Sequence, residues 1–207
     1  MPKAEWRLFL PSEEGDRPPS AAKPLTGLLD NVEPAMRTDV YIKANSDNGI
    51  KQRGGGGGLE LKTLQERKSL GGGVGPGIAE TFRKISLGDN ASVMHVIEYL
   101  RMNGGISEEL ESTIYDPVEV RVTKAVRKDT LKVGEGKVRF EFTEVTVSSA
   151  GMPEDYPQKW LTFCAEGTVE EIETFIGSKK GKPLVPLMSL RGALQVGYPQ
   201  FVQMISS

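Results

Sequence analysis

The sequence has very few of the residues on which several common chemistries depend. Cys164 is the only cysteine and His95 the only histidine among 207 residues. A single cysteine excludes an internal disulfide and any zinc site built on paired cysteines. A single histidine leaves little basis for Ser-His-Asp catalysis or for a metal site of clustered histidines. If the protein binds a metal ion, carboxylates must hold it.

Long apolar segments and an excess of basic residues are also missing. No run approaches the ~18 apolar residues of a membrane-spanning helix, and the first residues do not resemble a signal peptide. The 26 basic and 28 acidic residues give a formal net charge of -2, which does not indicate nucleic-acid binding. We therefore expect a cytoplasmic protein that binds neither membranes nor nucleic acids.

The length of 207 residues fits one large domain or two small ones, and the pattern of apolar and polar residues predicts more strand than helix. Strands are expected over residues 5–10, 39–42, 49–53, 59–62, 119–124, 137–147 and 159–166, with a hairpin between the third and fourth. Helices are expected over residues 89–103 and from the capping box at Thr168 to about Ile176, followed by two short helical patches in residues 186–205.

Six of the predicted strands have one apolar face and one strongly charged face, because side chains alternate between the two faces of a strand. The basic residues on the charged faces are Arg7, Lys51, Arg53, Lys62, Arg121 and Arg139, and the acidic ones are Glu5, Glu60, Glu119, Glu141 and Glu166.

Two architectures are compatible with these charged faces. In the first, a one-sided antiparallel sheet exposes its charged face to water. In the second, the sheet curls so that the charged faces enclose a wide, hydrated channel. Burying unpaired charges costs several kcal/mol per ion, so such a channel would hold a polyanion. Arginine and lysine would bind its phosphate oxygens, and clustered carboxylates would bind Mg²⁺ or Mn²⁺.

Several short motifs occur in a recognisable order along nearly the whole chain, from about Glu5 to Val202. They are Asp39-Val-Tyr41, Ile50-Lys-Gln-Arg53, Leu59-Glu-Leu-Lys62, Val122-Thr-Lys124 followed by Arg127, Arg139-Phe-Glu141 with Glu144, Trp160-Leu-Thr-Phe-Cys-Ala-Glu166, and Gly197-Tyr198-Pro. In their order and spacing these motifs resemble the CYTH superfamily, the triphosphate tunnel metalloenzymes, in a diverged form.

The resemblance implies a single domain over residues 1–207 with an α+β fold: a mostly antiparallel β-barrel of about eight strands with helices packed on the outside. It also implies metal-dependent hydrolysis of an inorganic, nucleoside or thiamine triphosphate inside the barrel, with Mg²⁺ or Mn²⁺ as cofactor. Glu5, Glu141 and Glu166 would then be the metal ligands. The substrate-binding residues would be Lys51, Arg53, Lys62, Arg121, Lys124, Arg127 and Arg139.

The sequence departs from the family pattern at positions that matter for a metal site. The first strand of the family carries Glu-x-Glu-x-Lys, but Arg7 and Phe9 stand at the second and third of these positions here. Cys164 stands where the first acid of a later Glu-x-Glu is expected. Lys124 also alternates out of phase with Arg121, so both point inward only if a bulge intervenes.

Other interpretations remain open at this level. The protein could be a non-catalytic binding module for a polyphosphorylated ligand, or an unrelated β-barrel or sheet with an apolar ligand or a structural role. The glycine runs 54–58 and 71–77 are interpreted as flexible connections, because no Gly-Lys-Ser/Thr follows them. His95 is interpreted as a surface or core residue, Cys164 as a small strand residue, and Trp6 and Trp160 as outward-facing apolar anchors beneath helices.

Overall fold

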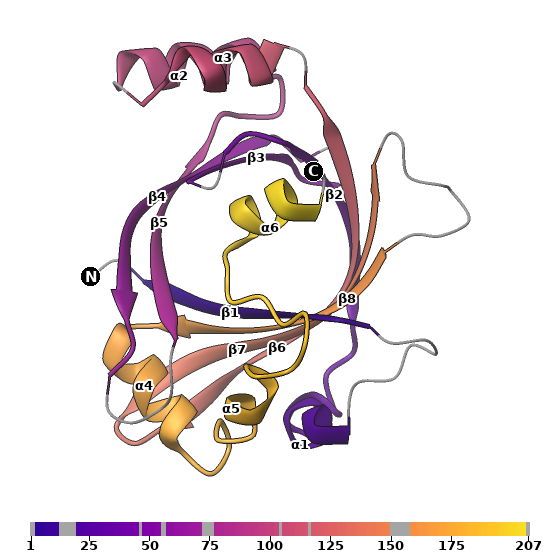
Figure 1. The fold of residues 1–207 in the computed structure, drawn as a ribbon, viewed down its shortest axis with the longest axis vertical. Coiled ribbons are helices and arrows are strands. Elements are labelled where there is room, and N and C mark those ends of the chain that lie inside the picture. The colour runs from indigo at the N-terminus through magenta and orange to yellow at the C-terminus, as the bar shows by residue number, and fades with distance from the viewer. Residues whose placement is uncertain are drawn as a thin grey trace.

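The computed structural model describes residues 3–12, 20–45, 47–54, 57–71, 77–103, 105–115, 117–149 and 158–205. Its antiparallel strands close into a barrel in the order β1-β5-β4-β3-β2-β6-β7-β8 (Figure 1). The expected α+β barrel is confirmed. The strands are β1 (Ala4–Pro11), β2 (Ala35–Ile42), β3 (Asn48–Gln52), β4 (Leu59–Ser69), β5 (Ile78–Ser86), β6 (Glu119–Val133), β7 (Gly136–Ser149) and β8 (Gln158–Gly167).

Most of the helices lie outside the barrel, and one lies within it (Figure 1). The helices are α1 (Lys23–Thr26), α2 (Val93–Met102), α3 (Glu108–Tyr115), α4 (Val169–Gly177), α5 (Leu184–Leu187) and α6 (Tyr198–Ile205), and two short 3-10 turns, η1 (Ser20–Ala22) and η2 (Gly27–Leu29), flank α1. Within the described ranges, every helix is too short or too polar to cross a lipid bilayer.

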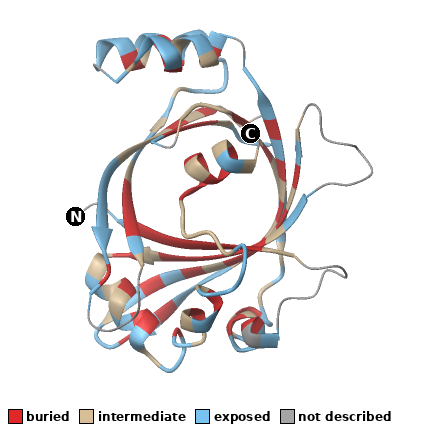
Figure 2. Cartoon of the chain, viewed as in Figure 1, coloured by how far each residue is buried: buried red, intermediate tan, exposed pale blue. Residues whose placement is uncertain are grey.

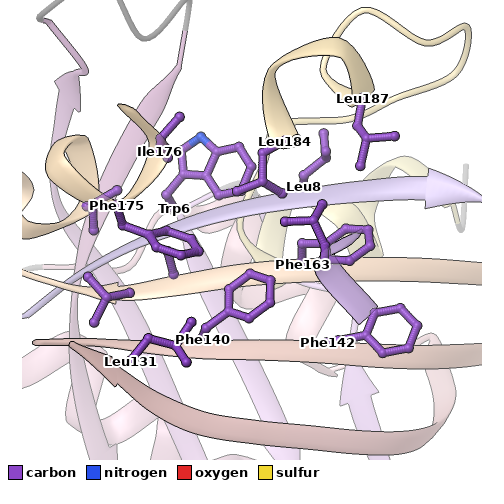
Figure 3. Packing of buried hydrophobic residues seen from close by; sticks show 14 of the residues in the cluster. Trp6, Leu8, Leu131, Phe140, Phe142, Phe163, Phe175, Ile176, Leu184 and Leu187 are labelled. Carbon is purple, nitrogen blue, oxygen red and sulfur yellow. The ribbon is translucent and has the colours of Figure 1, made fainter. Parts of the chain in front are cut away.

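The larger outer core lies between β1, β6, β7 and β8 and the helices α1, α4 and α5. Trp6 and Leu8 of β1 point outward and pack with Phe140 and Phe163 beneath α4 and α5 (Figure 3). Burial of each such side chain stabilises the fold by about 1.5–3 kcal/mol. The predicted capping box begins α4: the Thr168 hydroxyl accepts from the Glu171 amide, and the Glu171 carboxylate accepts from the Thr168 amide.

A second outer core lies beneath the α2–α3 hairpin. Ile50 of β3 and Leu61 of β4 pack against Val96 and Leu100 of α2. The helix expected over residues 89–103 is confirmed as α2, which is shorter. His95 is exposed and its ring closes the N-terminal cap of α2 with Ser92. Of the two alternatives, surface or core, the structure shows the surface.

The third core is inside the barrel and is built around α6. Phe201 of α6 stacks on Phe9 of β1 with 3.8 Å between ring centroids, and Val120 and Val122 of β6 belong to the same buried cluster. Figure 2 shows the buried part of α6 within the ring of strands. Trp160 packs edge-on against Phe201, so the prediction that it faces outward is wrong.

Several elements, among them α1 and the two 3-10 turns, and several boundaries were not predicted. Strand β5 and helix α3 were missed, and β6 and β7 form a longer hairpin than expected, turning at Gly134 with a φ of +57°. A positive φ of this kind is readily adopted by glycine. Residues 55–56 and 72–76, in the two glycine runs, lie outside the described residues, so their interpretation as flexible connections is untested.

Candidate functional site: a basic cavity inside the barrel

The part of the barrel interior that α6 leaves free is a cavity of about 270 Å³. Nine basic and four acidic side chains line it, although the chain as a whole has a net charge of -2. The excess of cations suits this cavity to an anion. The basic residues are Arg7, Arg37, Lys51, Arg53, Lys62, Lys84, Lys124, Lys128 and Arg139, and the acidic ones are Glu5, Glu60, Glu141 and Glu166.

Strand register places the charged residues of β1, β8 and β7 in two parallel rows. In one row, Glu5 lies opposite Glu166, which lies opposite Arg139. In the next row, Arg7 lies opposite Cys164, which lies opposite Glu141. Because residues two apart share a face, both rows point into the cavity.

From the adjoining strands β5 and β4, lysines converge on Glu5 of β1. Lys62 Nζ lies 2.7 Å from Glu5 Oε2, and Lys84 Nζ lies 2.7 Å from Glu5 Oε1. Burial alone would raise the pKa of Glu5, but Lys62, Arg7 and Lys84 outweigh this effect and hold its pKa well below the usual range. Burial lowers the pKa of Lys62 in spite of Glu5. Lys62 also lies over the Phe82 ring, 3.8 Å from its centroid.

A similar arrangement surrounds Glu60 of β4. Lys51 Nζ is 2.8 Å from one carboxylate oxygen and Arg53 Nη2 is 3.0 Å from the other. Burial would raise the pKa of Glu60, but these two cations lower it. The side chains of Arg53, Lys84 and Arg139 are almost half exposed, which places them at the mouth of the cavity.

Deeper in the cavity, Lys124 is fully buried beside α6. Its ammonium donates to Asp39 Oδ2 at 2.9 Å and to the Tyr41 hydroxyl at 2.7 Å, and it lies 3.9 Å from the centroid of the Tyr198 ring. Burial lowers the pKa of Lys124 to about 7, because desolvation and the nearby Arg37 outweigh the attraction of Asp39. The charge at this position therefore changes near neutral pH.

Arg7 is the most enclosed of the guanidinium groups. Its Nη1 donates to Glu141 Oε1 at 3.1 Å and to Thr162 Oγ1 at 3.3 Å, and its guanidinium carbon lies 4.7 Å from the centroid of the Tyr198 ring. Burial alone would lower the pKa of Arg7. Surrounding groups that include Glu141 outweigh this effect and raise the pKa above its usual range. Arg7 therefore keeps its charge.

Most of the residues predicted from the sequence meet in this cavity. The predicted ligands that line it are Glu5, Lys51, Arg53, Lys62, Lys124, Arg139, Glu141 and Glu166. Whether each binds substrate or metal remains a prediction. Lys124 points inward without a bulge, because β6 pairs with both of its neighbours in continuous register.

Arg121 and Arg127 do not line the cavity, and their predicted placement inside is wrong. Lys124 and Lys128 face inward, and alternation along β6 therefore directs Arg121 and Arg127 outward. Arg127 instead pairs with Glu144 of β7, with 2.8 Å between Nη1 and Oε1. Glu119 shares the outward face for the same reason. The apolar face of this end of β6 turns inward, because it packs on α6.

Several residues that line the cavity were not predicted from the sequence as ligands. Lys84 belongs to β5, which was not predicted, and Lys128 lies beyond the predicted end of its strand. Arg37 could have been found, because it alternates in phase with Asp39 and Tyr41 of the recognised Asp-x-Tyr motif. Tyr198 was noted in a motif, but its place in the cavity wall depends on α6 lying inside the barrel.

The carboxylates of the cavity do not fit a divalent metal ion as they stand. Glu5 pairs with two lysines, Glu141 with Arg7, and Glu166 with Arg139. In the described part of the chain, no three histidine, cysteine, aspartate or glutamate side chains gather closely enough to hold a metal ion. An Mg²⁺ or Mn²⁺ ion usually needs several free oxygen ligands, which these paired carboxylates do not present.

Comparison with known proteins gives a structural likeness only. No protein-family model and no curated protein matches the sequence. The fold is similar to that of HpAC1 from Hippeastrum, a proposed adenylyl cyclase described as having a dominant triphosphatase activity. The match has a TM-score of 0.52 and 13% sequence identity, and it covers 99% of this chain and 95% of that chain. Identity this low supports a common fold and no more.

Proposed function

We propose that the protein binds the triphosphate group of a small molecule in the barrel cavity. The observation that carries this proposal is the set of nine cations around a cavity with four carboxylates. Phosphate oxygens accept charge-assisted hydrogen bonds from arginine and lysine. A triphosphate would compete with Glu5, Glu60 and Glu166 for cations that these carboxylates now hold in place.

The size of the cavity suggests which part of the ligand enters. At about 270 Å³ it is slightly smaller than the pockets of about 300–1,000 Å³ that enclose drug-sized molecules. It would therefore take the phosphate chain and leave a nucleoside or thiamine group at the mouth. The half-exposed Arg53, Lys84 and Arg139 lie there and would contact the phosphate nearest the mouth.

Thermal shift and titration calorimetry with tripolyphosphate, ATP, thiamine triphosphate, diphosphate and sulfate would test the proposal. A ligand that binds only the folded state raises stability by about 2.7 kcal/mol at a hundred times its dissociation constant. We expect all three triphosphates to raise the melting temperature, and sulfate to raise it little. A melting temperature that none of the triphosphates changes, with no heat of binding, would remove the proposal.

A second candidate function is hydrolysis of the terminal phosphate. Water would attack the terminal phosphorus, the bond from this phosphorus to the bridging oxygen would break, and inorganic phosphate and the diphosphate product would leave. The motif resemblance to the CYTH superfamily and the fold likeness to HpAC1 support it. Phosphoryl transfer relies mainly on positioning and charge neutralisation, which cations of this cavity such as Lys62 could supply.

Phosphate release separates the two candidates. Purified protein would be incubated with each triphosphate, with Mg²⁺, with Mn²⁺ or with EDTA, beside the Lys62→Ala variant as a control for contaminating enzymes. Release that falls with the variant supports hydrolysis. Triphosphate binding without phosphate release under every condition would support a binding module without catalytic activity.

A further inference from the structure

The cavity contains a cation where the motif resemblance implies a carboxylate. Arg7 of β1 lies opposite Cys164 of β8, which lies opposite Glu141 of β7. The Arg7 guanidinium reaches over Cys164 to Glu141, with 3.1 Å between Nη1 and Oε1. A positive group therefore lies in the middle of the residues predicted as metal ligands.

Cys164 allows this arrangement because it is small and uncharged. The thiol is buried, and burial raises its pKa to about 12, so that it contributes no negative charge at neutral pH. The short side chain leaves room for the longer Arg7 side chain to cross β8. Of the three residues in this row, Glu141 alone is a carboxylate, and Arg7 neutralises it.

Arg7 is fixed in position yet incompletely bonded. Arg7 is 8% exposed and Tyr198 7% exposed, and both line the cavity. Arg7 Nε and the Tyr198 hydroxyl have no hydrogen-bond partner among the described residues. Buried polar groups are normally satisfied. Both residues line the cavity, so an anion oxygen there could accept from them after a small shift of either side chain. The Tyr198 ring holds the guanidinium from one side through a cation–π contact.

We propose that Arg7 is a built-in cation that takes the place of a protein-held divalent metal ion, so that the cavity binds a phosphate chain without Mg²⁺ or Mn²⁺. The proposal rests on the proposed function, since it concerns how the same ligand is held. In this proposal Arg7 and Tyr198 contact the phosphate group that lies deepest in the cavity. Glu5 and Glu166 stay paired with their basic partners.

The first test measures tripolyphosphate binding by calorimetry in EDTA and again in Mg²⁺. We expect the dissociation constant in EDTA to be no more than about twofold weaker than in Mg²⁺. Binding that needs the metal, or that weakens more than tenfold in EDTA, would overturn the inference and leave the proposed function standing. Absence of binding in both buffers would overturn both.

The second test removes the cation without leaving a charged partner. In the variant Arg7→Met with Glu141→Gln, both charges of the pair disappear, so that no carboxylate is left buried alone. We expect tripolyphosphate to bind about ten- to a hundredfold more weakly in EDTA, the effect of losing a hydrogen bond to a charged group. The matched control, Arg127→Met with Glu144→Gln on the outer face, should bind as the wild type does. Equal binding by both double variants would contradict the inference.

The third test tries to restore a metal site and uses Mn²⁺ alone as the probe. Arg7→Glu with Cys164→Glu would give three carboxylates in one row across β1, β8 and β7, at positions 7, 164 and 141, and remove the cation. Electron paramagnetic resonance should detect stoichiometric Mn²⁺ binding by this variant and none by the wild type. Stoichiometric Mn²⁺ binding by the wild type that is lost in Glu141→Gln would overturn the inference, and this result does not depend on whether the double variant folds.

Discussion

The two ends of the barrel interior differ sharply, although the same strands build both. Along β1, Glu5 and Arg7 line the basic cavity and Phe9 packs on α6; along β6, Lys124 faces the cavity and Val120 packs on α6. One inner surface is ionic and lines a cavity, and the other is apolar and filled by α6. The comparison teaches that alternation identifies which side chains share a face, whereas the neighbouring element decides which face is buried inside.

The largest expected effect concerns the apolar end. Phe201→Ala would remove a fully buried ring that stacks on Phe9, and should lower the free energy of unfolding by about 3–5 kcal/mol. Urea denaturation measures it. Met204→Ala, on the exposed side of the same helix, should change stability by less than about 0.5 kcal/mol. Similar small losses in both variants would show that α6 does not fill the barrel.

The second prediction concerns the ionic end. Lys62→Ala should weaken tripolyphosphate binding by about ten- to a hundredfold, because it removes a charge-assisted hydrogen bond worth about 1.5–3 kcal/mol. Calorimetry measures the dissociation constant. Arg121→Ala, a loss of equal charge on the outer face of β6, should leave affinity within about twofold. If the two variants weaken binding equally, the attraction is non-specific and the cavity is not the binding site.

The third prediction concerns Lys124, at the boundary between the two ends. Its pKa of about 7 means that it loses its charge as the pH rises through neutrality. Tripolyphosphate affinity should therefore fall by up to about tenfold per pH unit above 7, relative to Lys124→Met with Asp39→Asn. Calorimetry between pH 6 and 8.5 measures the difference. Parallel pH profiles for the two proteins would contradict a titrating Lys124.

The same group has a consequence for stability with the opposite sign. The unfolded lysine binds its proton up to its ordinary pKa of 10.5, whereas the folded one releases it near 7. Between these values the unfolded state binds more protons, so this residue makes the folded protein more stable as the pH rises. Urea denaturation of the wild type and the double variant at pH 7 and 9 would show this as a rise specific to the wild type.

The smallest expected effect lies outside the barrel. Arg127 and Glu144 are 2.8 Å apart, about as close as the cavity pairs, but on the outer surface. A double-mutant cycle with alanine at both positions should give a coupling of about 0.2–1 kcal/mol, since water screens exposed ion pairs. Ligand affinity should not change. A coupling above about 2 kcal/mol would mean that burial does not distinguish the two environments.

Much of the ionic end could be predicted from the sequence, because charged alternation is rare on an ordinary solvated face. Glu5, Lys51, Lys62 and Glu141 all share the predicted face. Prediction failed where the inside becomes apolar: on β6 the charged face was assumed to point inward, which misplaced Arg121. Nothing in the local pattern of residues 119–122 shows that a helix about 80 residues later will pack against Val120 and Val122.

The ion pairs of the cavity were less predictable than its lining. Glu5 meets Lys62 and Lys84 only because β1 and β4 both adjoin β5, and β5 was not recognised. Its residues 78–86 begin with apolar Ile78 and continue without regular alternation. Arg7 and Cys164 were noticed as departures from a motif, but their meeting across β8 follows from strand register, which requires the closed barrel.

The position of α6 determines how a linear anion can use the barrel. Phe201 and Phe9 fill the bore behind Arg7 and Tyr198, so the channel is a dead end at that side. A polyphosphate chain cannot thread through it and must insert one terminus, with the remaining units in solvent. Binding of polyphosphate should therefore depend on the concentration of chain ends and not on chain length. Cyclic phosphates, which have no chain end, should compete poorly.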